Sequence, residues 1–161
     1  MSTTPTFGPP LIGQTEKALN AILDRQLAGT GMTEPQWVTL TLTVAGGGSA
    51  DRGQLVGRVV TALKVRDAEA DSLIAELAAA QLLQASDDGD ASRVEVTDAG
   101  RQLHGRIRAR VGEITERLWG DLPAEDLASA GRVLSTVLAR ANAELARGPL
   151  ASALKGPDDD A

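Results

Sequence analysis

The chain has 161 residues, which is enough for one domain with a core and too few for two ordinary domains. Apolar residues make up 42% of it, so the chain is not disordered as a whole. It contains no cysteine, which excludes disulfides, thiolate metal sites and cysteine nucleophiles. The sequence shows no apolar run of membrane-spanning length and no secretory signal, so we expect a cytoplasmic protein without membrane contact.

The net charge of the chain is −6, from 22 acidic and 16 basic residues. This is the wrong overall sign for a protein that holds phosphate backbones. A local basic patch could still bind DNA, and the sequence must then supply one.

Composition predicts flexible tails at residues 1–10, which are rich in Pro, Thr and Gly, and at the acidic stretch 148–161. Helical spacing of apolar residues from Leu11 predicts a first helix that stops near Gly29. A capping box at Thr33-Glu34-Pro35-Gln36 starts the second helix. The run Gly46-Gly47-Gly48 ends it.

A third helix is predicted over 55–63, and Asp67 is expected to cap a fourth. The period then becomes alternating, which predicts strands at 82–86 and 93–97 around a hairpin tip, Asp87-Asp88-Gly89-Asp90. Thr97 is expected to cap a long fifth helix. Pro123 opens the last one.

This order of elements predicts a mainly α fold with a small β-hairpin. Residues 51–97 form a helix-turn-helix followed by a two-stranded wing, within a single domain over 11–147. The helical regions at about 11–29 and 98–147 carry apolar stripes too long for so small a domain to bury alone. A second copy of the chain would cover them, so we expect a two-fold homodimer.

Three stretches carry a resemblance to a known family. They are Met32-Thr33-Glu34-Pro35-Gln36-Trp37 at the second helix, residues 73–83 at the end of the fourth, and Val94-Glu95-Val96-Thr97-Asp98-Ala99-Gly100. The last of these is similar to a Leu-Thr-x-x-Gly junction, with Val96 in the Leu position. Over residues 11–146 the chain resembles the MarR family of bacterial transcriptional regulators.

The resemblance implies a dimer that places the fourth helix in the DNA major groove and the wing at the minor groove. It also implies a pocket for a small ligand between the dimer region and the DNA-binding lobe. The expected function is therefore a transcriptional regulator whose binding to double-stranded DNA responds to a small molecule.

The fourth helix and the wing depart from the family pattern. If Leu73, Ile74 and Leu77 pack inward, the outward residues are Ala68, Glu69, Asp71, Ser72, Ala75 and Glu76. At the wing tip, Asp88-Gly89-Asp90 replaces the family's Asp-x-Arg. Residues 66–90 hold seven acids and one base, a charge that repels phosphates.

Three interpretations follow from this departure. The chain still binds DNA, it acts through its ligand pocket or a protein surface after losing operator binding, or its acidic lobe mimics DNA towards another regulator. The acids could also be an ordinary solvated face. The candidate DNA-binding residues are Arg52, Arg58, Lys64, Arg66, Ser72 and Arg93.

Trp37 and His104 are the candidate ligand-binding residues. Each also has a structural interpretation, as a core residue for Trp37 and as an ordinary surface or boundary side chain for His104. No motif places carboxylates beside a nucleophile, and Gly46–Gly48 lacks the Lys-Ser/Thr of a phosphate-binding loop. We expect no enzymatic activity, no cofactor and no metal site.

Overall fold

A computed structural model describes residues 6–88 and 91–148. The chain divides near residue 115 into two compact units, and each is described by itself. The elements in chain order are α1 (Pro9–Leu27), α2 (Glu34–Ala45), β1 (Ser49–Asp51), α3 (Arg52–Leu63), α4 (Asp67–Ala79), β2 (Leu83–Asp88), β3 (Ala91–Val96), α5 (Asp98–Trp119) and α6 (Ala124–Arg147). None of the described helices is long and apolar enough to cross a membrane.

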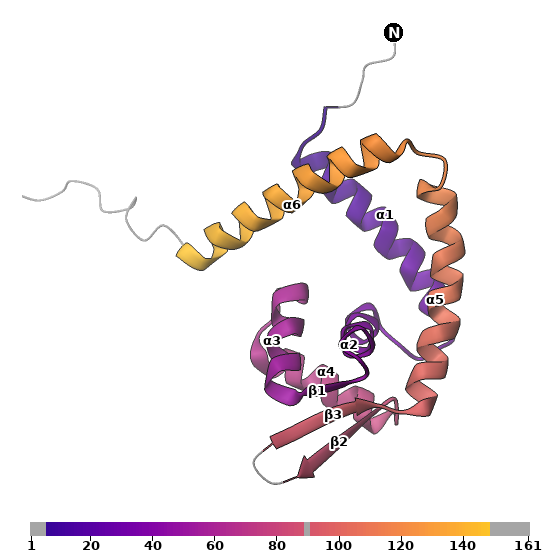
Figure 1. Cartoon of the computed structure of the whole chain (residues 1–161), viewed down its shortest axis with the longest axis vertical. Coiled ribbons are helices and arrows are strands. Elements are labelled where there is room, and N and C mark those ends of the chain that lie inside the picture. The colour runs from indigo at the N-terminus through magenta and orange to yellow at the C-terminus, as the bar shows by residue number, and fades with distance from the viewer. Residues whose placement is uncertain (1–5, 89–90, 149–161) are drawn as a thin grey trace, which may run out of the picture. The chain divides into compact units, whose positions relative to one another are not determined.

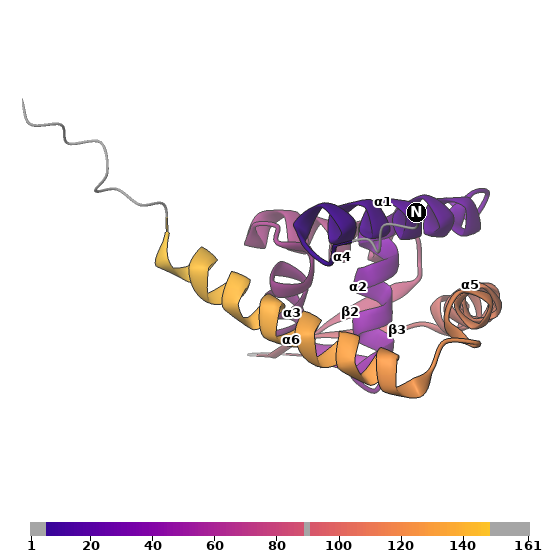
Figure 2. The same cartoon turned by 90° about the horizontal axis from the view of Figure 1, so that it is seen from above.

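The first two helices follow the sequence closely. α1 begins at Pro9, within the stretch predicted as a tail, because proline suits the first turn of a helix. The predicted capping box of α2 is confirmed: Gln36 Oε1 accepts from the Thr33 backbone N–H at 3.0 Å, and Thr33 Oγ1 accepts from the Gln36 N–H at 3.5 Å. α1 crosses α2 near one end (Figure 2).

The sheet has three antiparallel strands in the order β1-β3-β2. The hairpin is longer than predicted, with Leu83 opposite Val96 and Ala85 opposite Val94, and it extends from the helices as a wing (Figure 1). The strand β1 was not predicted, because three residues are too few to show an alternating pattern. β1 leads directly into α3, whose N-cap is Asp51; its Oδ1 accepts from the Gln54 N–H at 2.9 Å.

The prediction that Asp67 caps α4 is wrong. Asp67 is the first residue of the helix, and Arg66 occupies the cap position with an extended backbone. The carboxylate of Glu69 accepts from the Arg66 backbone N–H at 3.0 Å. Only the Glu69 half of a capping box is present, because the arginine side chain has no oxygen that could accept from the N–H groups of the first turn.

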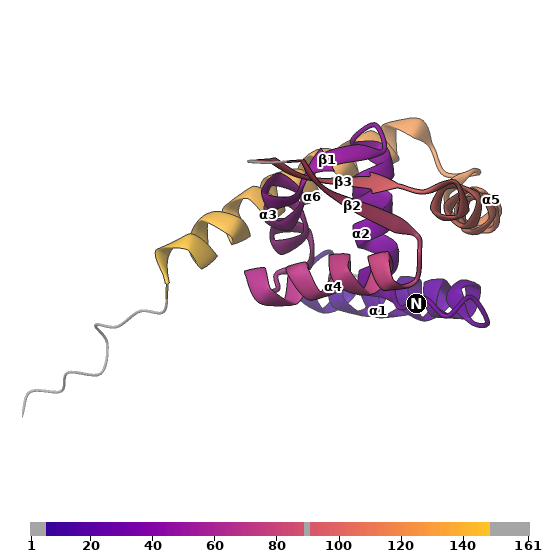
Figure 3. The ribbon, with the colours of Figure 1, turned by 90° about the horizontal axis from the view of Figure 1, so that it is seen from below.

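Helices α2, α3 and α4 pack together and against the sheet (Figure 3). The core side chains of this lobe are 0–2% exposed, and they are Leu40, Leu55, Val59, Ala70, Ile74, Leu77, Leu83 and Val94. Ile74 and Leu77 face this core as predicted, and Leu73 is half-buried against it. The predicted winged-helix lobe is therefore confirmed.

The junction between the wing and α5 is tightly tied. Thr97 caps α5 as predicted, because its Oγ1 accepts from the Gly100 N–H at 3.0 Å. The same hydroxyl donates to the carbonyl of Gln81 at 2.7 Å. A Cβ on Gly100 would lie 2.2 Å from the carbonyl oxygen of Leu82. Only glycine fits there, which explains the Thr-x-x-Gly spacing of the junction.

The second unit contains the end of α5 and the whole of α6. Among its described residues, no side chain of α6 is buried. The apolar side chains of α6 are between 36% and 66% exposed, and they are Leu127, Val133, Leu134, Val137, Leu138 and Leu145. A helix of this length with an exposed apolar stripe needs a partner surface.

We predict that Gly100→Ala destabilises the protein by about 1–3 kcal/mol, because the new methyl group overlaps the Leu82 carbonyl. Gly105→Ala in the same helix is the matched control, since a Cβ there meets nothing within 4 Å. That change should be neutral or stabilising by up to about 1 kcal/mol. Urea unfolding of both variants measures the difference, and equal stabilities would contradict the tight junction.

Candidate nucleic-acid interface and aromatic site

The outward face of α4 is the first candidate interface. All six residues predicted to point outward are exposed, and they are Ala68, Glu69, Asp71, Ser72, Ala75 and Glu76. A helix in this position of a winged helix can enter a major groove with its exposed face. The face carries three carboxylates, so their partners decide how negative it is.

Each of these three carboxylates has a partner within the lobe. Asp71 forms an ion pair with Arg52 of α3, at 2.8 Å from the guanidinium NH2 and 2.9 Å from Nε. Glu76 accepts from the side-chain amide of Gln36 in α2 at 2.8 Å.

Glu69 takes its partner from the start of its own helix. It accepts from the backbone N–H and from the guanidinium of Arg66, and these contacts lower the pKa of the Glu69 carboxyl. Arg52 and Arg66, two candidate DNA-binding residues, are therefore already paired with acids of α4.

The remaining candidates on this side of the lobe differ in their contacts. Ser72 is exposed on α4 and unobstructed towards solvent. Lys64 ends α3 in a left-handed backbone conformation, and its Nζ donates to the carbonyl of Thr61 at 2.7 Å. Arg93 of β3 is exposed and donates to the Ser49 hydroxyl of β1 at 2.8 Å. The wing-tip residues Gly89 and Asp90 lie outside the described residues.

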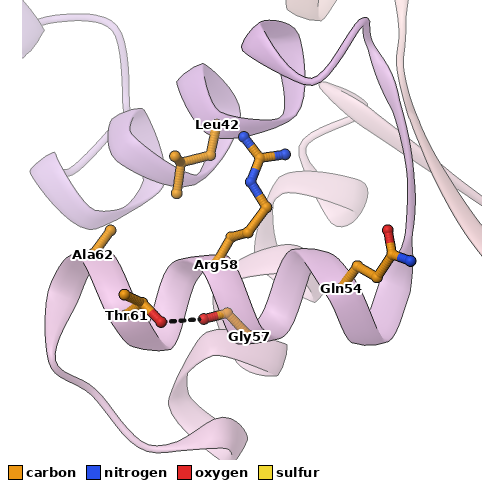
Figure 4. Close-up of a pocket in the computed structure, with 6 residues that line it drawn as sticks. All are labelled: Leu42, Gln54, Gly57, Arg58, Thr61 and Ala62. Atoms are coloured by element: carbon orange, nitrogen blue, oxygen red, sulfur yellow. Dashed lines mark hydrogen bonds between the residues drawn. The ribbon is translucent and has the colours of Figure 1, made fainter.

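Arg58 lies apart from the other five candidates. It is half-buried and lines a groove between α2 and α3 (Figure 4). A Cβ on Gly46 would lie 2.7 Å from its NH1, so its guanidinium rests against the end of α2. The structure brings Arg52 to α4 and Arg58 to α2, although both belong to α3.

The two candidate ligand-binding residues lie against each other. The rings of Trp37 and His104 stack with centroids 4.9 Å apart and planes 21° apart. Trp37 is 9% exposed and His104 is 6% exposed. The interpretation of His104 as a surface or boundary residue is therefore wrong. Its burial follows from its place one turn after Gly100, on the side of α5 that meets the lobe.

The imidazole of His104 has an unsatisfied ring nitrogen. Its Nε2 is buried and has no hydrogen-bond partner among the described residues. Burial, and to a lesser degree the positive charge of Arg108, lower the pKa of His104. The ring is therefore a neutral, buried group with a free polar atom beside an indole. A buried polar atom without a partner is costly, so a hydrogen-bonding ligand would stabilise this site.

Sequence reasoning missed the contacts between the acids of α4 and their partners. Arg52 and Asp71 are 19 positions apart, and Gln36 and Glu76 are 40 apart. No local pattern indicates such pairs. The sequence indicated Gln36 only as a capping residue, a role that uses its side-chain oxygen. Its side-chain nitrogen remained available for a second contact, and it donates to Glu76.

Comparison with known proteins gives the fold a context. No known family model matches the sequence, and no curated protein matches it either. A MarR-family regulator from Silicibacter pomeroyi DSS has a TM-score of 0.69 and 21% identity, covering 83% of this chain and 88% of its own. CouR from Rhodococcus jostii RHA1, bound to p-coumaroyl-CoA, has a TM-score of 0.68 and 17% identity, covering 80% and 89%.

A third solved structure is NadR in complex with 4-hydroxyphenylacetate, with a TM-score of 0.64 and 21% identity, covering 86% of this chain and 98% of its own. Each of these three structures aligns with 80–86% of this chain. The chain has the winged-helix fold of the MarR-family transcriptional regulators.

Proposed function

We propose that this protein is a homodimeric transcriptional regulator that binds double-stranded DNA through α4 and the wing, and that a small aromatic ligand modulates this binding. The observation that carries the proposal is a winged helix whose α4 exposes its outward face. Ser72 and Arg66 would contact the DNA from α4, and Arg93 from the wing, with Arg52 and Lys64 beside them.

The pairing of the acids supports DNA binding despite the negative charge. Arg52 lies outside residues 66–90 and neutralises Asp71, so the charge counted over that stretch overstates by one the negative charge that a phosphate would meet. Arg66, already counted there, is the partner of Glu69. Both pairs are partly exposed and are therefore weak. A phosphate could compete with either carboxylate for its arginine.

A second candidate function is favoured by the acidic residues themselves. If the arginines stay with these carboxylates, they are not available to a phosphate. The charges of Asp67 and Glu76, which no arginine neutralises among the described residues, would then face a basic protein instead of DNA. The protein would then act as a protein-interaction module without operator binding. Direct measurement of DNA retention separates the two functions.

We predict that Asp71→Asn raises DNA affinity, because it frees the guanidinium of Arg52 for a phosphate. Binding of random-core duplexes at low salt, followed by sequencing and a salt titration, measures this. One added contact in each protomer steepens the log–log salt slope by roughly two units for a dimer. Asp24→Asn on the exposed face of α1 is the control of equal charge change. Failure of both wild type and Asp71→Asn to retain any duplex would refute DNA binding.

The proposed ligand site is centred on Trp37 and His104. The two rings face each other, so a ligand would contact their remaining edges, and the unpartnered Nε2 of His104 offers one polar contact. NadR and CouR, which share the fold, bind ligands that contain an aromatic ring. This chemistry supports a small phenol or aromatic acid as the ligand.

We predict that His104 titrates with a midpoint below 6.5, because burial favours its neutral form. As pH falls below 6.5, the unfolded chain takes up this proton first, so the contribution of His104 to stability falls. His104 is the only histidine, so one imidazole signal in a proton–carbon NMR spectrum reports it directly.

Addition of 4-hydroxyphenylacetate should shift this imidazole signal in the wild type and leave it unmoved in Trp37→Ala. Trp119→Phe is the control, because Trp119 lies at the end of α5. A midpoint above 6.5 would contradict the burial of His104. A midpoint below 6.5 without any shift on addition of 4-hydroxyphenylacetate would refute this class of ligand and leave the burial of His104 unaffected.

The exposed stripe of α6 supports the homodimer. Its apolar side chains need cover, and a second copy of the chain offers an equivalent stripe across a two-fold axis. We predict that Leu138→Glu, at a site 58% exposed, shifts the sedimentation coefficient from dimer towards monomer. Thr136→Glu, on the opposite face of α6, is the matched control. Equal sedimentation of the two variants would refute this interface.

A further inference from the structure

We propose that the groove between α2 and α3 is a second ligand site, which binds a small organic monoanion with an apolar body. In this site the guanidinium of Arg58 would hold the carboxylate of the ligand. The site is separate from the Trp37–His104 pair and does not require DNA binding, so it goes beyond the function proposed above.

The groove has the size and the lining of a small-ligand site. Its volume is about 490 Å³, and its lining residues are Leu42, Gln54, Gly57, Arg58, Thr61 and Ala62. Because the groove is wide open to solvent, it would cover one side of a ligand rather than enclose it. Figure 4 shows Arg58 reaching from α3 towards α2, beside Leu42. The apolar surface of Leu42 and Ala62 would cover the body of the ligand.

Arg58 is the one charged residue in this lining. Across residues 6–88 and 91–148, its guanidinium forms neither a hydrogen bond nor an ion pair. Arg52 and Arg66, by contrast, are both paired with carboxylates. A half-buried guanidinium without a partner retains its donors, and it presents two of them side by side in the geometry that a carboxylate accepts.

The position of Arg58 is held from one side. Its NH1 lies against Gly46, the C-cap of α2. The negative end of the helix dipole favours a cation at this place. The end of α2 therefore favours a cation in this position before any ligand arrives.

The rest of the lining favours one charge on the ligand and no more. No acid lines the groove, so nothing repels an anion. The hydroxyl of Thr61 donates to the carbonyl of Gly57 at 2.8 Å, which leaves its lone pairs and the amide of Gln54 as the remaining polar groups. A second carboxylate on the ligand would lack a cation.

The groove is distinct from the aromatic site. Leu42 follows Trp37 by five positions in α2, which places the two side chains roughly 140° apart around the helix. Occupation of one site can therefore be measured separately from occupation of the other.

The test compares two probes, 4-phenylbutyrate and its neutral amide, by amide NMR titration of the full chain. We expect the acid to shift the signals of residues 57–62 and to bind about tenfold more tightly than the amide. Arg58→Gln should remove this difference, whereas Arg25→Gln, on exposed α1, should keep it. Gly57→Leu should block both probes, because a Cβ at Gly57 meets nothing within 4 Å and the larger side chain fills the groove without disturbing the helix.

Four results would overturn the proposal. The first is equal affinity for the acid and the amide in the wild type, or no saturable binding of either. The second is unchanged binding in Gly57→Leu. The third is a map of shifts centred on Trp37 and His104, which would assign the probe to the aromatic site instead. A loss of duplex retention in Arg58→Gln without any probe binding would assign Arg58 to a DNA phosphate and would likewise overturn it.

Discussion

The contact between Gly100 and the carbonyl of Leu82 fixes how α5 leaves the wing. A side chain at this position would have no room, and the hydroxyl of Thr97 joins the same turn to the backbone of Gln81. Since the helix starts at a fixed place and in a fixed direction, His104 arrives one turn later against Trp37. The backbone contact at Gly100 therefore helps to position the aromatic pair.

Each carboxylate on the outward face of α4 has a hydrogen-bond donor beside it in the same lobe. Acids on α4 meet donors from three different places: α3, the start of α4, and α2. Two of these contacts link α4 to α3 and to α2, and all three reduce the negative field in front of α4. The two roles compete, because a phosphate that draws Arg52 away also removes a link between α3 and α4. DNA affinity and lobe stability are coupled through that one arginine.

Much of this architecture could be read from local sequence signals. The capping box at Thr33 and the Thr97 cap act over four residues or fewer, so each was visible in the sequence. The change from helical to alternating period is a signal within one continuous stretch and was visible as well. The features that could not be predicted depend on contacts between residues far apart in the sequence. The strand β1 exists only because β3 pairs with it, and Asp71 is compensated only because the fold brings Arg52 beside it. The position of His104 was misjudged for the same reason, since burial on α5 is decided by α2.

Gln36 carries a consequence for sequence variation. At the third position of a capping box glutamate and glutamine ordinarily serve equally well, because either can accept from the N-cap N–H. Here the amide nitrogen of the same side chain also donates to Glu76. A glutamate would keep the helix start and place two carboxylates face to face. Drift at this position is therefore restrained by a residue 40 positions away, and Gln36 and Glu76 would be expected to change together across a lineage rather than one at a time.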